Sequence, residues 1–333
     1  MKVTIKEIAK LANVSPTTVS RALGGYGYVS KETKEQVFKV AEKLNYTPNM
    51  LAKSMVTGKT KNIGLIIGDI ENPFFSTLAK AVNDFIISEN YNLLIANTYE
   101  SQEEEKKIIS SFLQKQVDGI IIATSYSNDE KNGKNVFNDF FKSKTPIVLV
   151  DRSLKWSKID SVTSKNFEGG YEATKYLIEK GHKKIGFLGD FLSISSTSDR
   201  YEGYKKALED FEIPFNKSYV KFGSFTVLSG YRKTVELFSQ DDKPTAVFTS
   251  HSLMSVGLLF ALKDMNIKLN EINMIGFDDL DWFTLLTPPI SAVEQQVKEM
   301  GEYAARLLIK RIEGFNGPIQ QICLPVTMKI RGT

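Results

Sequence analysis

Residues 15–23, Ser-Pro-Thr-Thr-Val-Ser-Arg-Ala-Leu, have the features of a short helix with two different faces. Ser15 is a favourable N-cap residue, and Pro16 fits the first helical turn because no backbone donor is lost there. Helical spacing gives an apolar face of Val19, Ala22 and Leu23 and a polar face of Thr17, Ser20 and Arg21. The apolar face is expected to pack, and the polar face offers hydrogen bonds to base edges in a DNA groove.

Two more helices are expected around this stretch. Residues 4–7, Thr-Ile-Lys-Glu, have the capping-box form, and apolar residues then recur at helical spacing up to a break at 13–14. Another helix starts after the cap Ser30, and its apolar positions are Val37, Val40, Ala41 and Leu44. Residues 1–46 therefore read as an all-α helix-turn-helix head, although three small helices can also form a purely structural bundle.

A fourth helix is expected at 46–55, Tyr-Thr-Pro-Asn-Met-Leu-Ala-Lys-Ser-Met. It has room for only about two turns, and a helix of that length does not hold itself in water. Its apolar strip of Leu51, Ala52 and Met55 predicts that it folds against a partner helix in a groove. We therefore assign residues 47–60 to a hinge helix and linker, and expect the chain to form a homodimer.

Four stretches are highly specific when they occur in one chain. They are Thr-Ile-Lys-Glu-Ile-Ala-Lys-Leu-Ala-Asn-Val-Ser at 4–15, Thr-Val-Ser-Arg at 18–21, Tyr-Thr-Pro-Asn at 46–49 and Ile-Gly-Phe-Asp at 275–278. Over essentially its whole length the chain resembles the lactose-repressor and purine-repressor family of bacterial transcription factors. The resemblance implies a dimeric regulator, expected to be a repressor of a carbohydrate or related catabolic operon, that binds a near-palindromic double-stranded operator. We expect DNA contacts from Thr4, Ser15, Pro16, Thr17, Thr18, Ser20, Arg21, Tyr46, Asn49, Ala52, Lys53 and Met55.

The charge is concentrated at one end of the 333-residue chain. The first 60 residues carry ten Lys and Arg against four Asp and Glu, whereas the whole chain has a net charge of +4. A basic module on a near-neutral body is typical of a nucleic-acid-binding head. Cys323 is the only cysteine, no apolar run approaches membrane-spanning length, and the N-terminus leads straight into a capped helix. We expect a cytoplasmic protein, nucleoid-associated when bound to its operator, without contact to a membrane.

Strands and helices alternate beyond the linker, as in parallel α/β sheets buried on both faces. Strands are expected at 63–67, 93–96, 119–123, 147–150, 184–189, 219–220, 246–248 and 274–277, with a final strand at 325–331. Helices are expected at 78–88, 103–114, 198–211, 229–238 and 297–312, with one more ending at 265. The fold class is therefore the all-α head plus two doubly wound α/β lobes, of periplasmic-binding-protein type by resemblance. The resemblance implies one lobe from 61–162 plus 292–322 and another from 163–291 plus 323–333.

Ligands of doubly wound sheets bind beyond the carboxyl ends of the strands, so we expect an effector in a cleft between the lobes. The residues that follow strands there include Ser125, Asp151, Arg152 and Asp278. The family places effector contacts at positions that match Phe74, Phe75, Ser125, Arg200, Phe225, Asp278 and Gln295. Aromatic rings with charged groups suit a sugar or sugar derivative. Phe74 and Phe75 could instead be ordinary core residues, and Asp278 a helix cap.

One departure from the family pattern concerns the ligand. His251-Ser252 follows the strand at 246–248, where the family commonly has Asn-Asp. We therefore add His251 to the expected effector contacts, and expect a ligand other than a plain hexose. On this hypothesis His251, when protonated, is free to donate to a phosphate or carboxylate. Phe74 and Gln295 are expected to face Asp278 and Arg200 from the opposite lobe.

Other function classes find less support in the sequence. The two histidines, His182 and His251, cannot form a two-histidine metal motif, and no phosphate-binding loop or nucleophile elbow occurs. We therefore expect no catalytic residue, cofactor or metal. Gly-Gly-Tyr-Gly at 24–27 links two head helices, so it is expected to be a flexible turn facing the DNA backbone. The alternatives left open are a catabolite-control regulator with a protein co-regulator and a solute-binding protein with a vestigial head.

Overall fold

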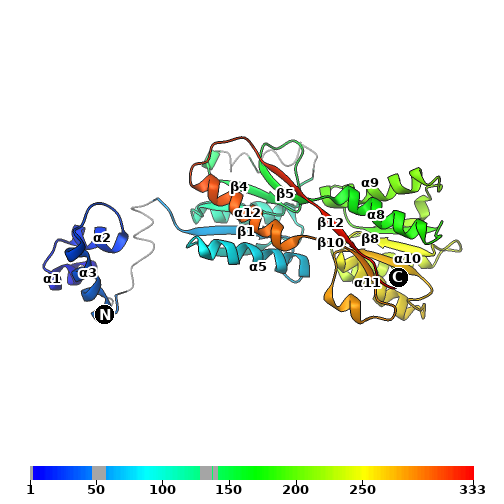
Figure 1. Ribbon diagram of the computed structural model, residues 1–333, viewed down its shortest axis with the longest axis horizontal. Helices are drawn as coiled ribbons and strands as arrows, with labels where there is room; N and C mark the ends of the chain where they lie inside the picture. The colour runs from blue at the N-terminus through cyan, green and yellow to red at the C-terminus, as the bar shows by residue number, and fades with distance from the viewer. Residues whose placement is uncertain (1–2, 47–57, 128–136, 138–141) are drawn as a thin grey trace. The chain divides into compact units, whose positions relative to one another are not determined.

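The computed structural model describes residues 3–46, 58–127, 137 and 142–333 (Figure 1). The chain forms two compact units, Met1–Lys61 and Asn62–Thr333. Most of the hinge and linker expected at 47–60 lies outside the described residues. The same is true of four of the predicted DNA contacts, Asn49, Ala52, Lys53 and Met55.

The head is the predicted three-helix unit. Its helices are α1 (Ile5–Leu11), α2 (Pro16–Gly24) and α3 (Lys31–Lys43). The predicted capping box at residues 4–7 is present, and Ser15 and Ser30 cap the next two helices. The buried core of the head consists of Ile8, Ala9, Ala12, Val19, Ala22, Val37 and Ala41. The helix-turn-helix prediction is confirmed, because the apolar faces read from the sequence are the ones that pack.

The first lobe of the larger unit is a parallel six-stranded sheet with the order β11-β5-β4-β3-β1-β2. Its strands are β1 (Asn62–Ile67), β2 (Asn92–Asn97), β3 (Gly119–Ile122), β4 (Ile147–Val150), β5 (Asp160–Ser164) and β11 (Gln321–Leu324). Helices α5 (Pro73–Ser88) and α12 (Val297–Ile312) cover one face, and α6 (Gln102–Gln114) covers the other. The bounds predicted for α12 are confirmed.

The second lobe is a sheet with the order β12-β10-β9-β8-β6-β7, in which only β12 is antiparallel to its neighbour. Its strands are β6 (Ile185–Gly189), β7 (Val220–Phe222), β8 (Ala246–Thr249), β9 (Asn273–Phe277), β10 (Ser291–Gln295) and β12 (Val326–Lys329). Its helices are α8 (Asn166–Glu179), α9 (Ser195–Asp210), α10 (Val227–Phe238) and α11 (Ser252–Asp264). Helices α8 and α9 pack on one face, and α10 and α11 on the other. Two 3₁₀ turns, η1 (Lys217–Tyr219) and η2 (Asp281–Leu285), complete the lobe.

The chain passes between the two sheets three times (Figure 1). The passages follow β5, β10 and β11, at residues 165, 296 and 325. The resemblance places them near 162, 292 and 323, a few residues earlier. Strands β5 and β10 are rich in polar residues, and the sequence prediction did not include them. Both strands are nevertheless largely buried, so tertiary packing decides their conformation.

Two elements of the first lobe differ from the sequence prediction. Helix α5 starts five residues earlier than expected, because Asn72 caps it and Pro73 occupies its first turn. Phe74 and Phe75 therefore lie on a helix and not in a loop. Strand β2 is not buried on both faces, and Ile95 is 46% exposed, because β2 lies at the edge of the sheet. No helix among the described residues is long and apolar enough to cross a membrane.

Candidate functional site

The polar face of α2 lies at the surface of the head. Thr17 and Arg21 are exposed on this helix, while Val19 lies in the head core. The Ser15 hydroxyl accepts the Thr18 amide at 3.0 Å and lies 2.8 Å from the Thr18 hydroxyl. Arg21 is therefore the cation that this exposed face presents. Of the other predicted DNA contacts, Thr4 caps α1, Pro16 begins α2 and Tyr46 packs against the head core.

Tyr26 fixes the turn after α2, a role that was not predicted from the sequence. The Tyr26 hydroxyl forms a hydrogen bond with the hydroxyl of Ser20 on α2. A Cβ atom on Gly24 would overlap the Tyr26 ring, so the ring lies directly over this glycine. The expected flexible turn is thus folded back on the recognition helix, and Ser20 already has a partner.

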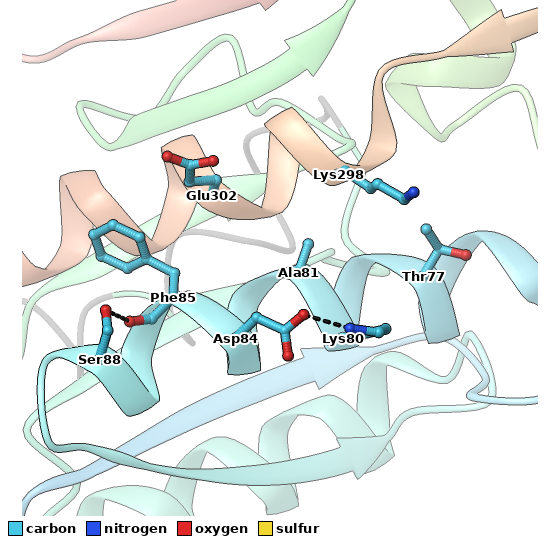
Figure 2. A pocket seen from close by; sticks show the side chains of 8 residues that line it. All are labelled: Thr77, Lys80, Ala81, Asp84, Phe85, Ser88, Lys298 and Glu302. Carbon is cyan, nitrogen blue, oxygen red and sulfur yellow. Dashed lines mark hydrogen bonds and ion pairs between the residues drawn. The ribbon is translucent and has the colours of Figure 1, made fainter.

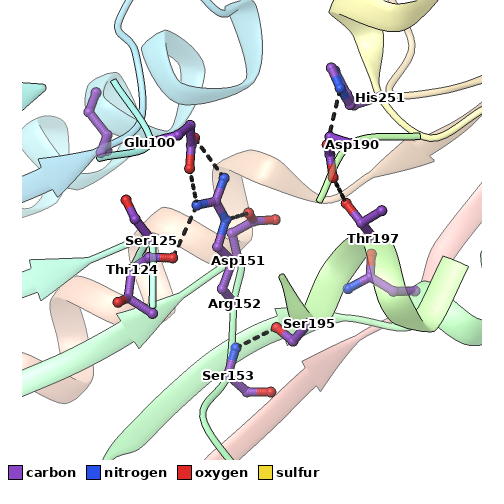
Figure 3. Close-up of polar contacts among 12 residues, drawn as sticks. Glu100, Thr124, Ser125, Asp151, Arg152, Ser153, Asp190, Ser195, Thr197 and His251 are labelled. Atoms are coloured by element: carbon purple, nitrogen blue, oxygen red, sulfur yellow. Dashed lines mark hydrogen bonds and ion pairs between the residues drawn. The ribbon is translucent and has the colours of Figure 1, made fainter. Parts of the chain in front are cut away.

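In the first lobe, the strand ends bring together the residues expected to bind an effector. Arg152 follows β4 and is only 2% exposed. Its terminal nitrogens donate to Glu100 at 2.5 and 2.8 Å and to the Thr124 carbonyl at 3.0 Å (Figure 3). The guanidinium carbon also lies 4.9 Å from the ring centroid of Phe225, which belongs to the second lobe. The charge of Arg152 is therefore already matched by Glu100, a residue that the sequence analysis did not select.

Ser125 and Asp151 lie beside this ion pair. The Ser125 amide donates to the buried carboxylate of Glu105 at 2.5 Å, and its hydroxyl lies 3.2 Å from that of Thr98. Asp151 has a positive φ of 65°, and one of its carboxylate oxygens lies 3.3 Å from Arg152 Nε. Burial raises the pKa of Asp151, and the neighbouring positive charge of Arg152 opposes this shift.

In the second lobe, His251 faces a carboxylate that the sequence analysis missed. Asp190 follows β6, is 1% exposed and accepts a hydrogen bond from Thr197. Its other oxygen lies 3.1 Å from His251 Nε2, close enough for an ion pair but not aligned for a hydrogen bond (Figure 3). The His251 ring also stacks on Phe225 at 5.2 Å. Neither ring nitrogen of His251 makes a hydrogen bond among the described residues, but Asp190 lies where an external anion would approach Nε2. The strand-end rule that selected Asp151 would also have found Asp190.

Arg200 is buried on α9 and points at the backbone of the neighbouring strand end. Its Nε donates to Asn166 Oδ1 at 2.8 Å, and one terminal nitrogen donates to the Ser250 carbonyl at 2.6 Å. Its guanidinium carbon lies 3.6 Å from the ring centroid of Phe277. Burial lowers the pKa of Arg200, and the charge of Asp278 opposes this shift.

Asp278 and Gln295 lie on the same lobe, which corrects the prediction that they face each other from opposite lobes. Gln295 ends β10 in the second sheet, and its amide donates to Asp278 at 2.6 Å. Asp278 also accepts the Ser252 amide at 3.4 Å. The Ser252 hydroxyl donates to Asn72 of the first lobe at 3.3 Å. A second bridge between the lobes is the Ser153 amide, which donates to the Ser195 hydroxyl at 2.9 Å.

Two cavities lie between the lobes and contain most of the predicted aromatic contacts. One, of about 360 Å³, is lined by residues that include Phe75, Phe225 and Glu100. The other, of about 510 Å³, is lined by residues that include Phe74, Asp278 and Gln295. The buried polar atoms near them without a hydrogen-bond partner among the described residues are Arg152 Nε, Asp190 Oδ2, Ser250 Oγ, both ring nitrogens of His251 and Gln295 Oε1. Buried polar groups normally have partners, so this cluster indicates a ligand site.

A third hollow, of about 490 Å³, lies between α5 and α12, away from the cleft between the lobes (Figure 2). Its charged residues have both signs, Lys80, Asp84, Lys298 and Glu302. Lys80 and Asp84 form an ion pair, so this groove presents no single sign of charge to a ligand. Among the described residues, no group of three His, Cys, Asp or Glu side chains could hold a metal ion.

Known proteins resemble this chain along its whole length. Residues 4–49 match the description "Bacterial regulatory proteins, lacI family", and residues 174–333 match "Periplasmic binding protein-like domain". The HTH-type transcriptional repressor PurR of Haemophilus influenzae (strain PittEE) is 33% identical over 96% of this chain and 94% of its own. A solved transcriptional regulator CelR–cellobiose complex is 25% identical, with a TM-score of 0.74, over 99% of each chain. A lac repressor dimer bound to operator, 23% identical, matches 99% of this chain and 98% of its own with a TM-score of 0.86, and so shares the fold.

Proposed function

Because the chain belongs to the lacI family of bacterial regulatory proteins, we propose that its head reads an operator half-site and its cleft binds a small effector. The chain is a DNA-binding transcriptional repressor and not an enzyme. The observation that carries the residue assignment is the exposed polar face of α2 on a basic head of three packed helices.

Two observations argue against the alternatives to a repressor with a small effector. A solute-binding protein with a vestigial head would not need the capped and packed α2 or its exposed Arg21. A protein co-regulator in place of a small ligand would leave the unpartnered buried atoms of the cleft unexplained. We therefore favour a small effector. We also propose that the protein acts in the cytoplasm, at the nucleoid when bound to its operator.

We assign a base contact to Arg21, with guanine as the base. Arg21→Ala should weaken binding to the operator about tenfold and binding to a random duplex much less, because a base contact adds roughly 1–3 kcal/mol of discrimination. Fluorescence anisotropy at one fixed salt concentration, on an operator selected from genomic fragments, measures both affinities.

Lys10→Ala is the matched control for this measurement, since Lys10 is also an exposed cation in the last turn of a head helix. It should change both affinities alike. Equal losses on operator and random DNA for Arg21→Ala would make Arg21 a phosphate contact.

A homodimer provides the twofold symmetry that a near-palindromic operator requires. The solved lac repressor that shares the fold of this chain is a dimer bound to operator, which supports the dimer proposed here.

The effector that we propose is a sugar or sugar derivative. Four aromatic rings line the 360 Å³ cavity, those of Phe75, Tyr99, Phe191 and Phe225, and polar groups lie next to them. Rings that stack on apolar sugar faces, with carboxylates that accept hydroxyls, are the chemistry of carbohydrate recognition.

Asp278 offers a direct test of effector binding. Asp278→Asn should weaken the effector about tenfold, because the bonds that a charged carboxylate accepts are roughly twice as strong as those of an amide. Asparagine tolerates the positive φ of 73° and can still accept the Gln295 amide, so the backbone should be retained.

Calorimetry with the effector identified in a thermal-shift screen of sugars measures the change. Asp241→Asn is the control, since Asp241 is an exposed carboxylate of the same lobe and lines neither of the two cavities. An unchanged affinity in Asp278→Asn would remove Asp278 from the site.

A further inference from the structure

The 360 Å³ cavity between the lobes is lined by negatively charged side chains but by no positively charged ones among the described residues. The described residues that line it include two carboxylates, Asp69 and Glu100, and no lysine or arginine. The remaining lining residues are aromatic, apolar or uncharged polar. A ligand that enters here therefore meets acidic groups and ring faces first.

The deeper part of the cleft also contains more carboxylates than positively charged groups. Two guanidinium groups, those of Arg152 and Arg200, interact electrostatically there with four carboxylates, which are Glu100, Asp151, Asp190 and Asp278. The formal charge of these six groups is −2. Arg152 gives two hydrogen bonds to Glu100, so its charge is engaged within the protein. Arg200 donates to the Asn166 side-chain oxygen and to the Ser250 main-chain carbonyl.

The buried polar atoms of the cleft that lack a hydrogen-bond partner indicate which groups a ligand would have to supply. Asp190 Oδ2 and Gln295 Oε1 are acceptors in side chains that are more than nine-tenths buried, and neither has a hydrogen-bond partner among the described residues. Arg152 Nε is a donor without such a partner, but it lies 3.3 Å from the Asp151 carboxylate, and the unpartnered His251 Nε2 lies 3.1 Å from Asp190. The two acceptors call for donors from a ligand. Hydroxyl and ammonium groups supply donors, whereas an ionised phosphate or carboxylate supplies only acceptors.

We propose that the cleft selects effectors that bring hydrogen-bond donors and no negative charge, namely neutral or amine-bearing polyhydroxylated molecules, and rejects phosphorylated and carboxylated ones. This rests on the proposed effector function of the cleft and narrows its ligand class. It replaces the hypothesis of a phosphate held by His251, because Asp190 lies directly beside that ring (Figure 3). A negatively charged group there would add to a like charge in a site of low dielectric constant.

The charge bias can be measured without knowing the effector. In a Cys323→Ser background, which removes the exposed native cysteine, Ser224→Cys places a thiol in the lining of the cavity. Its rates of reaction with a cationic and an anionic methanethiosulfonate reagent report the local potential. Thr226→Cys lines the same cavity and serves if the first variant does not fold. Ser110→Cys on α6 is the control, because Glu103, Lys106 and Lys107 give it neighbours of both signs.

We expect the ratio of cationic to anionic rates in the cleft to exceed that at residue 110 at least tenfold in low salt, since a cleft of one sign concentrates counter-ions by such factors. The excess should disappear at 1 M salt, where the Debye length is about 3 Å. Asp69→Asn should reduce it severalfold. A ratio equal to or below that of the control would overturn the proposal. The measurement uses no DNA, so this outcome is distinct from a failure of operator binding.

Discussion

Gly203→Ala is expected to lower the free energy of unfolding by about 3 kcal/mol, at the upper end of what overpacking costs. Gly203 lies on α9 where its backbone touches that of α8. A Cβ atom there would overlap the Phe167 carbonyl oxygen and lie 2.7 Å from the Tyr171 nitrogen. Both neighbours are backbone atoms, so only separation of the two helices can relieve the overlap.

Backbone overlap and helix propensity predict opposite changes in stability for Gly203→Ala. Helix propensity alone would make alanine more stable than glycine by about 1 kcal/mol. Urea unfolding followed by circular dichroism decides between the two, with Glu202→Ala, a change at an exposed neighbouring position, as the control. A variant as stable as the wild type would show that α8 and α9 can move apart at no cost.

The same substitution should impair the effector site. Arg200 lies one turn before Gly203, and its bond to Asn166 joins α9 to the start of α8. Conversely, a Cβ atom on Gly170 would overlap the Arg200 carbonyl oxygen. Separation of the helices would move Arg200, so Gly203→Ala should also weaken the effector in calorimetry.

Glu105→Gln is expected to remove a pH dependence of stability worth about 3 kcal/mol. Glu105 is completely buried, and burial raises its pKa from 4.5 to about 7, although hydrogen bonds from the Ser125 amide and the Thr124 hydroxyl oppose the shift. A carboxyl group whose pKa is raised by folding stays protonated in the folded state where the unfolded chain has already lost its proton.

The sign follows from this difference in bound protons. The folded protein is not penalised by Glu105 below pH 4.5, and it loses stability as the pH rises from 4.5 to about 7. At 1.36 kcal/mol for each pKa unit, the loss reaches about 3 kcal/mol by pH 8. Glutamine resembles the protonated acid, and the Thr124 hydroxyl can rotate to accept from its amide.

Thermal or urea unfolding between pH 5 and 8 measures the slope. Glu105→Gln should match the wild type at pH 5 and exceed its stability at pH 8. Glu104→Gln is the matched control, since Glu104 precedes it on α6 and pairs with Lys107 at the surface. Parallel slopes for the wild type and Glu105→Gln would show that Glu105 is ionised in the folded protein without penalty.

The effector site was only partly predictable from sequence. Strand ends located Ser125, Asp151 and Asp278, because in parallel sheets every carboxyl end lies at the same edge. They did not reveal that Glu100 takes up the charge of Arg152, or that Asp190 faces His251. Each of these pairs joins loops far apart in the chain, and no local pattern encodes which loops meet.

The sequence by itself determined the head, the alternation of strands and helices, and the family. Capping residues and apolar periodicity act within a few residues, so α1, α2 and α3 could be read directly from the chain. Only the tertiary structure decided that the polar segments β5 and β10 are strands, that Gln295 lies beside Asp278, and that the cleft holds more carboxylates than guanidinium groups. These features depend on burial and on the approach of distant segments, and such interactions exist only once the sheets have formed.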